Sequence, residues 1–156
     1  MDAIAIAGTR SCEFADMRSE DIESVLDIEQ RIYAFPWTRG NFEDSLASGY
    51  VARLLRDGKK LLGYAVMMRI ADEVHLLNIT VVPERQHKGL GGFLLESLCV
   101  DARKGGAVCV VLEVRESNIA GRAFYQRHGY VQIGERKDYY PAVHGREAAL
   151  VLEKRL

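Results

Sequence analysis

The sequence has few of the features that mark secreted or membrane proteins. Only three of its 156 residues are cysteine, and only three are proline. Cys12, Cys99 and Cys109 are odd in number and fit neither a disulfide framework nor a Cys-x-x-Cys metal or redox pair. No apolar run approaches the roughly 20 residues of a membrane-spanning helix, and no basic segment precedes the short apolar stretch at the start. These absences predict a cytoplasmic protein that is neither secreted nor inserted in a membrane.

An excess of one charge is missing as well. The chain has 21 basic and 22 acidic residues, so it lacks the field that draws a protein onto nucleic acid or an anionic membrane. Its four histidines are scattered without metal-ligand spacing, and we expect no metal site. What is present, 48% hydrophobic and 28% charged residues without repeats or linkers, is typical of one globular domain. We expect a flexible leader over residues 1–11 and a single domain over residues 12–156.

The spacing of apolar residues predicts strands and helices that alternate in the second half of the chain, after a hairpin region in the first. Pro36 ends one helix, Thr38 can cap the next, and Asp57-Gly58 suits a tight hairpin turn. Strands are predicted at 13–18, 50–55, 61–70, 74–82, 107–114, 130–136 and 148–152. Helices are predicted at 19–32, 38–46 and 118–128, and from Leu90 to near Gly105-Gly106. The fold class is therefore mixed α/β (α+β), with a mixed, mostly antiparallel twisted sheet of about seven strands flanked by helices.

A glycine-bearing turn, Arg85 to Gly92, lies between a predicted buried strand and an amphipathic helix. Glycines let a ligand approach the backbone, and the start of a helix attracts phosphate groups. A Walker A loop is excluded because Phe93 follows Gly92 where Lys and then Ser or Thr would be needed, and the dinucleotide fingerprint fails at Leu94. Two interpretations of this turn are left: a phosphate site of another kind, or a plain turn between strand and helix.

Two further residues stand out. Glu113 interrupts an apolar strand that is predicted to be buried on both faces, and desolvation raises the pKa of a carboxyl group toward values useful to a general base. The alternative is a structural ion pair, for example with Arg115 or Arg122. The second is Tyr125, twelve residues later, and its simplest interpretation is a ring that packs in the core with Phe124, with the hydroxyl at the edge.

The segment from Asn78 to Gly91 resembles the acetyl-CoA signature of the GNAT N-acetyltransferases, whose loop pattern Q/R-x-x-G-x-G/A is filled by Gln86, Gly89 and Gly91. The resemblance narrows to the RimI-like group, the ribosomal-protein-alanine N-acetyltransferases. It rests on segments spread over most of the chain: Ala34–Trp37, His75–Ile79, Leu112–Arg115 with Ser117-Asn118, Tyr139–Pro141 and Gly145–Glu147. A histidine stands at position 87, where arginine is common in the family, and a second glycine, Gly92, follows Gly91.

The resemblance implies acetyl-CoA as co-substrate and a role for each matching residue. Glu113 would be the general base and Tyr125 the general acid, while Asn118 would contact the cofactor. The strand would pair with the pantetheine arm and the loop would hold the pyrophosphate, through Ile79, Thr80, Val81, Gln86, His87, Lys88, Gly89, Leu90 and Gly91. An amine would then attack the thioester directly in a ternary complex, because no acyl-enzyme is needed.

The resemblance also implies the substrate, the N-terminal α-amine of a protein and in particular the N-terminal alanine of a small-subunit ribosomal protein. In the family the aromatic segments Tyr33–Trp37 and Asp138–Pro141 flank a peptide N-terminus. A GNAT enzyme for lysine side chains or small-molecule amines is one alternative, and a non-catalytic CoA-binding regulatory module is another. Neither nucleic acid nor membrane is an expected partner, and the oligomeric state is left open.

Overall fold

A computed structural model describes residues 12–86 and 89–156. The predicted leader, His87 and Lys88 lie outside the described residues. The elements are β1 (Glu13–Asp16), a 3-10 turn (Ser19–Asp21), α1 (Ile22–Ile32), α2 (Arg39–Ala47), β2 (Val51–Asp57), β3 (Lys60–Ile70), β4 (Glu73–Val81), a second 3-10 turn (Pro83–Arg85), α3 (Leu90–Lys104), β5 (Cys109–Arg115), α4 (Ile119–Arg127), β6 (Val131–Pro141) and β7 (Arg146–Arg155).

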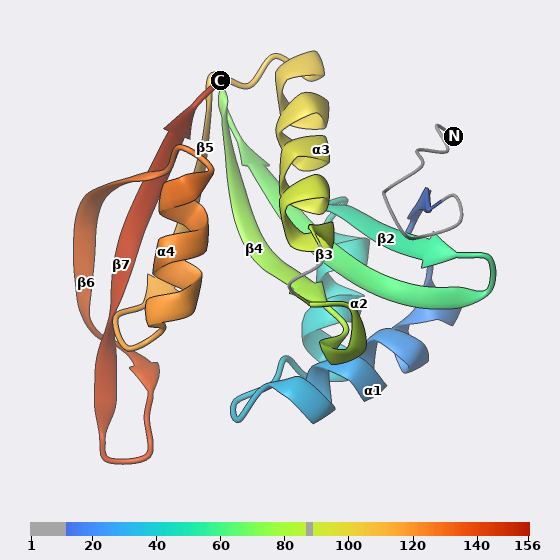
Figure 1. Cartoon of the computed structure of the whole chain (residues 1–156), viewed down its shortest axis with the longest axis horizontal. Helices are drawn as coiled ribbons and strands as arrows, with labels where there is room; N and C mark the ends of the chain where they lie inside the picture. The colour runs from blue at the N-terminus through green and yellow to red at the C-terminus, as the bar shows by residue number, and fades with distance from the viewer. Residues whose placement is uncertain (1–11, 87–88) are drawn as a thin grey trace. The chain divides into compact units, whose positions relative to one another are not determined.

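The seven strands follow the order β1-β2-β3-β4-β5-β7-β6 (Figure 1). Strands β4 and β5 pair in parallel, whereas β2 pairs antiparallel with β1 and β3, and β7 pairs antiparallel with β5 and β6. The predicted mixed, mostly antiparallel sheet with flanking helices is confirmed.

The chain divides into two compact units, and β3, β4 and α3 each run from one into the other. The first unit comprises Met1–Met68 and Asn78–Glu96, and the second comprises Arg69–Leu77 and Ser97–Leu156. The end of β4 therefore belongs to the first unit, together with β1, β2 and most of β3, while the start of β4 pairs with β5 in the second.

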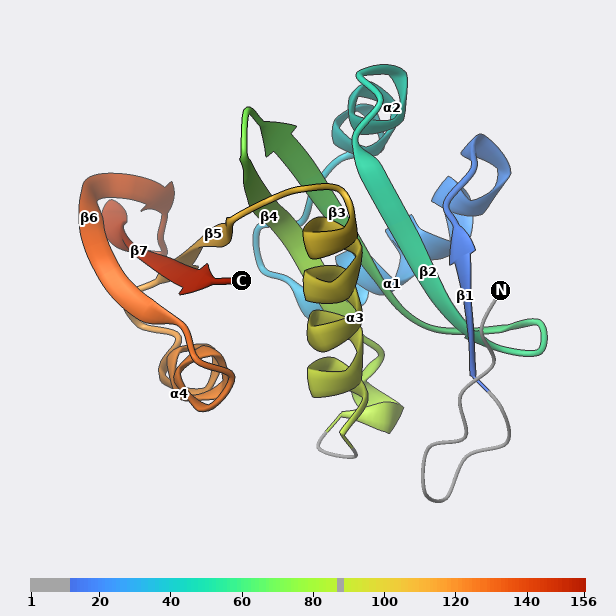
Figure 2. The ribbon, with the colours of Figure 1, turned by 90° about the horizontal axis from the view of Figure 1, so that it is seen from above.

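The core of the first unit lies on both faces of its strands. Because neighbouring strand residues point to opposite faces, Leu54 packs in the cluster that includes α1 and α2, whereas Leu55 packs with Leu62 and Leu90 at the start of α3. Figure 2 shows α1 and α2 on one side of β2 and β3 and the first turns of α3 on the other.

Local signals placed the starts of α2 and α4 correctly, whereas the helix expected from Ser19 begins as a 3-10 turn and α1 starts at Ile22. The Thr38 side chain accepts a hydrogen bond from the backbone N–H of Asn41 at 3.2 Å and caps α2. Asn118 likewise accepts from the N–H of Gly121 at 2.9 Å and caps α4. These side-chain oxygens satisfy N–H groups that the first turn of a helix leaves without a backbone partner.

The largest difference from the expected strands concerns β6 and β7, which run longer than the predicted 130–136 and 148–152. The pairing of β6 shifts register twice, and Asp138 has a φ of 51°, so the alternation that marks a strand is broken beyond Arg136. In β4, Leu77 is 37% exposed, and the expected burial of this strand on both faces is wrong at that residue. Among residues 12–86 and 89–156, no helix is long and apolar enough to cross a membrane.

Candidate functional site

The turn that follows β4 leaves the backbone open at Gly89, just before α3. The Gln86 amide donates to the Val81 carbonyl at 3.0 Å and holds the turn against the strand end. Gly89 has a φ of +83°, a left-handed conformation that favours glycine, and nothing lies within 4 Å of where a Cβ would stand. Leu90 is buried and begins α3, with Gly91 in the first helical turn. The open backbone at a helix start is suited to an anionic group.

The strand segment before this turn is supported closely by β3. A Cβ added to Gly63 would lie 2.6 Å from the Thr80 carbonyl oxygen, so only glycine lets the two backbones approach this closely. The N–H of Val82 also donates to the Leu62 carbonyl at 2.9 Å. Residues Ile79 to Val81 are thus held in a fixed path along β3.

A buried carboxylate that was not predicted from the sequence contacts Asn78, the residue before Ile79–Val81. Glu29 is 2% exposed and accepts hydrogen bonds from the Tyr64 hydroxyl at 2.5 Å, the Asn78 amide at 3.2 Å and the Trp37 backbone N–H at 3.0 Å. Burial and then the bond to Glu29 raise the pKa of Tyr64 far above its ordinary value. A signal was available, because Glu29 continues the apolar face of α1 that includes Ile22 at helical spacing.

Tyr33 continues this network at the surface. Its hydroxyl lies 2.7 Å from the Thr80 hydroxyl and donates to the Ile79 carbonyl at 3.4 Å, and the Thr80 hydroxyl donates to Asn78 at 2.9 Å. Although the whole residue is 38% exposed, desolvation of its hydroxyl raises the pKa of Tyr33, while the bond to Thr80 opposes that shift. The segment after α1 is therefore tied to the end of β4.

In the second unit, Glu113 is accessible and paired. Its side chain is 23% exposed and lies 3.1 Å from the Arg136 guanidinium. The expected burial on both faces is therefore wrong, and so is the expected partner. Arg115 instead pairs with Glu147, and Arg122 donates to a backbone carbonyl. A carboxylate that solvent can reach is able to exchange a proton with a bound amine.

Two tyrosines of β6 lie beside Glu113. Burial, followed by a hydrogen bond to Glu113, raises the pKa of Tyr139, and burial with the nearby Glu113 charge raises the pKa of Tyr140 to about 12. The Arg136 guanidinium lies 5.2 Å from the centre of the Tyr139 ring, and that of Arg115 lies 4.5 Å from the centre of the Tyr140 ring. Glu113 therefore lies among aromatic and cationic groups.

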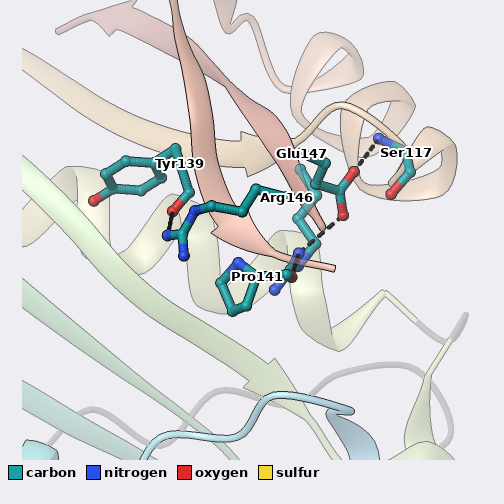
Figure 3. Close-up of polar contacts among 6 residues, drawn as sticks. Ser117, Tyr139, Pro141, Arg146 and Glu147 are labelled. Carbon is teal, nitrogen blue, oxygen red and sulfur yellow. Dashed lines mark hydrogen bonds and ion pairs between the residues drawn. The ribbon is translucent and has the colours of Figure 1, made fainter. Parts of the chain in front are cut away.

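Arg146 holds the backbone at Tyr139, and Glu147 binds Arg115 and Ser117 (Figure 3). Arg146 donates to the carbonyls of Asp138 and Tyr139, each at 2.8 Å, where the backbone of β6 bends. Glu147 accepts from Arg115 at 2.9 Å and from the Ser117 N–H at 3.2 Å. A hydrogen bond from the Ser117 side chain lowers the pKa of Glu147 most, and the bond from Arg115 lowers it further. The Gly145–Glu147 segment, which contributed to the family resemblance, thus braces the hairpin.

The other predicted residues of the second unit lie at α4. Tyr125 is half-buried, and its ring meets that of Tyr130 at 5.7 Å and that of Phe124 at 5.3 Å. Both the packing role and a role for its hydroxyl fit this position. Asn118 uses its side-chain oxygen for the cap of α4.

The predicted site residues thus fall into two sets. Ile79, Thr80, Val81, Gln86, Gly89, Leu90 and Gly91 belong to the first unit, and Glu113, Asn118 and Tyr125 belong to the second.

The chain is similar to known proteins over most of its length. Residues 22–130 match the model of the Acetyltransferase (GNAT) family. The chain is 36% identical over 138 residues to the [ribosomal protein bS18]-alanine N-acetyltransferase of Escherichia coli K12, covering 88% of this chain and 93% of that enzyme. It is 35% identical to the Haemophilus influenzae protein of the same name, covering 85% and 90% of the two chains.

The structure is also similar to solved structures of N-acetyltransferases. The crystal structure of the ribosomal-protein-S18-alanine N-acetyltransferase from Escherichia coli matches with a TM-score of 0.86 at 34% identity, covering 92% of this chain and 93% of that one. The PaiA N-acetyltransferase of Thermoplasma acidophilum, solved in complex with coenzyme A, matches with a TM-score of 0.76 at 18% identity over 94% of this chain and the whole of that chain, and shows the same fold.

Proposed function

This chain belongs to the GNAT acetyltransferase family and is an N-acetyltransferase that uses acetyl-CoA, and we propose that its acceptor is the N-terminal alanine of a ribosomal protein. The observation that carries the proposal is the similarity to the Escherichia coli enzyme, which extends over 93% of that enzyme rather than over a cofactor motif alone. A ribosomal acceptor also supports a cytoplasmic location.

The first unit supplies the residues for acetyl-CoA. We propose that the backbone amides of Ile79 and Val81 pair with the pantetheine arm, as an added strand would, with Thr80 between them. The open backbone at Gly89 and the helix start at Gly91 fit a pyrophosphate, whose charge the helix dipole favours. The remaining proposed contacts are Gln86, His87, Lys88 and Leu90, with Asn118 from the second unit.

The second unit supplies the groups that move protons. An amine attacks a thioester only when it is neutral. An α-amine has a pKa of about 7.7 to 8.0, against about 10.4 for lysine, so a base deprotonates the α-amine more easily at neutral pH. Glu113 accepts the proton of the amine, directly or through a water, as the new N–C bond forms. Tyr125 donates its proton to the sulfur as the C–S bond breaks.

The two aromatic segments of the chain are proposed to flank the peptide. In the first unit, Tyr33–Trp37 is tied to the end of β4 through the Tyr33 hydroxyl. In the second, Asp138–Pro141 is held by Arg146, and Tyr139 lies beside Glu113. The Tyr139 ring beside the base would orient a short peptide end with little loss of side-chain entropy.

Matched peptides test the acceptor. One peptide begins with a free alanine followed by the N-terminal sequence of ribosomal protein bS18, and its partner carries the same sequence with a blocked N-terminus and one lysine. We expect the free peptide to be acetylated at least about 10²-fold faster at pH 7, because its amine is far more often neutral. Equal rates on the two peptides would refute the α-amine assignment.

A further inference from the structure

Glu29 is a buried carboxylate that the proposed chemistry does not use. Burying a charge is costly unless it is hydrogen-bonded on all sides, so its surroundings have to be matched to it. Its partners come from three different segments: the Trp37 backbone after α1, the Tyr64 hydroxyl of β3 and the Asn78 amide of β4. Glu29 therefore joins parts of the first unit that are far apart in sequence.

One of those segments, residues Tyr33–Trp37, is held at both of its ends. At Trp37 the backbone N–H donates to Glu29 at 3.0 Å. At Tyr33 the hydroxyl contacts Thr80 at 2.7 Å and the Ile79 carbonyl at 3.4 Å. We call residues 33–37 the acceptor segment. Both connections lead to residues 78–80 of β4, one through Glu29 and Asn78, the other directly.

We propose that Glu29 is a positioning residue that couples acetyl-CoA binding at the end of β4 to the placement of the acceptor segment. The inference rests on the proposed function, in which residues 79–81 bind acetyl-CoA and the acceptor segment contacts the peptide. A ligand that fixes the strand then fixes Asn78 and Thr80, and through Glu29 and Tyr33 the acceptor segment. Bound acetyl-CoA should therefore strengthen peptide binding. By thermodynamic linkage, the peptide then strengthens acetyl-CoA binding by the same factor.

The chemistry of the carboxylate explains why glutamine is the informative replacement. A carboxylate accepts from all three donors at once, whereas glutamine has one accepting oxygen and turns an NH₂ group toward the NH₂ of Asn78. Glu29→Gln keeps the volume and breaks this pattern. Adding Asn78→Asp exchanges donor and acceptor across the contact, and the carboxylate introduced at that position still offers an oxygen to the Thr80 hydroxyl.

Trp37 is the only tryptophan in the sequence, so its fluorescence reports on the acceptor segment alone. We would titrate the full chain with acetyl-CoA, without any acceptor, and measure Trp37 emission and its quenching by acrylamide. In the unaltered protein we expect acetyl-CoA to reduce the quenching. In Glu29→Gln we expect that response to be lost and acetyl-CoA affinity to fall by roughly fivefold. Glu29→Gln with Asn78→Asp should recover most of both.

A control separates coupling from stability. Ser45 is also buried in the first unit, and its hydroxyl donates to the Asn41 carbonyl at 2.8 Å. Ser45→Ala should lower the melting temperature and leave the Trp37 response intact. If Glu29→Gln lowers only the melting temperature and keeps the response, Glu29 is merely structural and the proposal is overturned.

A second variant keeps the test decisive if Glu29→Gln does not fold. Tyr33→Phe removes the other connection at a partly exposed position, and it should weaken the Trp37 response and raise the peptide KM by roughly tenfold. A response that is unchanged both in Tyr33→Phe and in Asn78→Ala, which removes the amide that joins Glu29 to β4, would overturn the proposal. Because the fluorescence titration needs no acceptor, failure of the alanine peptide to react would refute the proposed function while the coupling was still measured.

Discussion

The two units each contain one glutamate in an unusual setting, and the settings are opposite. Glu29, in the first unit, is 2% exposed and accepts from a phenol, an amide and a backbone N–H. Glu113, in the second unit, has a side chain that is 23% exposed, with Arg136 and Tyr139 as neighbours. One carboxylate is enclosed by fixed donors, and the other is open on one side.

The comparison shows that burial decides whether a carboxylate can exchange protons or only positions its neighbours. A general base has to take a proton from a substrate and release it again, which requires a path to both substrate and solvent. A carboxylate whose oxygens are all occupied inside the core instead fixes the groups around it. The same residue type therefore organises structure in the first unit and fits proton transfer in the second.

The sharpest test of this comparison is to change each glutamate to glutamine. Glu113→Gln should lower kcat/KM by about 10²-fold or more at neutral pH, and the deficit should shrink as rising pH supplies neutral amine. Its melting temperature should change little, because an exposed ion pair contributes little to stability. A pH series of initial rates beside a thermal melt measures both.

Glu29→Gln is the matched control, and it should show the reverse pattern: a clear loss of melting temperature and a rate deficit that does not shrink at high pH. A pH-independent deficit in Glu113→Gln would contradict the role of Glu113 as base.

A smaller effect is expected at Tyr125, the proposed acid of the second unit. Tyr125→Phe should lower kcat by roughly 30-fold while acetyl-CoA affinity stays nearly unchanged, because the hydroxyl acts mainly in the transition state. Tyr130→Phe is the control, since Tyr130 is buried and its ring contacts that of Tyr125. Equal losses in the two variants would mean that packing, not proton donation, explains the effect.

The next effect tests the first unit through its glycines. Gly89→Ala and Gly58→Ala both place a side chain at a positive φ, +83° and +60°, with nothing within 4 Å of the new Cβ. Both should cost about 1 kcal/mol of stability. Only Gly89→Ala should weaken acetyl-CoA binding, by roughly tenfold in calorimetry, because its Cβ and altered backbone obstruct the phosphate site. Similar affinities in both variants would remove the pyrophosphate assignment.

The smallest effect is expected at the buried cysteines. Burial raises the pKa of the Cys109 thiol, so little of it is thiolate at neutral pH, and Cys99 is 1% exposed beside Tyr130. Cys99→Ala and Cys109→Ala should each retain rates within about twofold, with kinetics that show a ternary complex. Ping-pong kinetics or an acetylated cysteine found by mass spectrometry would contradict direct attack.

Features that depend on nearby residues are the ones that the sequence predicts best. The sequence predicts the helix caps at Thr38 and Asn118 and the end of α3 before Gly105. Capping and the spacing of apolar residues both act within a few residues. The full length of β6 was missed because its bend at Asp138 is held by Arg146, from the next strand. Glu113 was found from its place in an apolar strand, but its partner, Arg136, was not.

What the sequence determined by itself was the set of elements, the mixed sheet and the family to which the chain belongs, since these follow from local pattern and from motifs. What only the tertiary structure decided was which side chains meet. Glu29 and Asn78 are 49 residues apart in sequence and 3.2 Å apart in space. No local spacing encodes such a pair, because it depends on how α1, β3 and β4 pack, and packing is determined by the whole of the core.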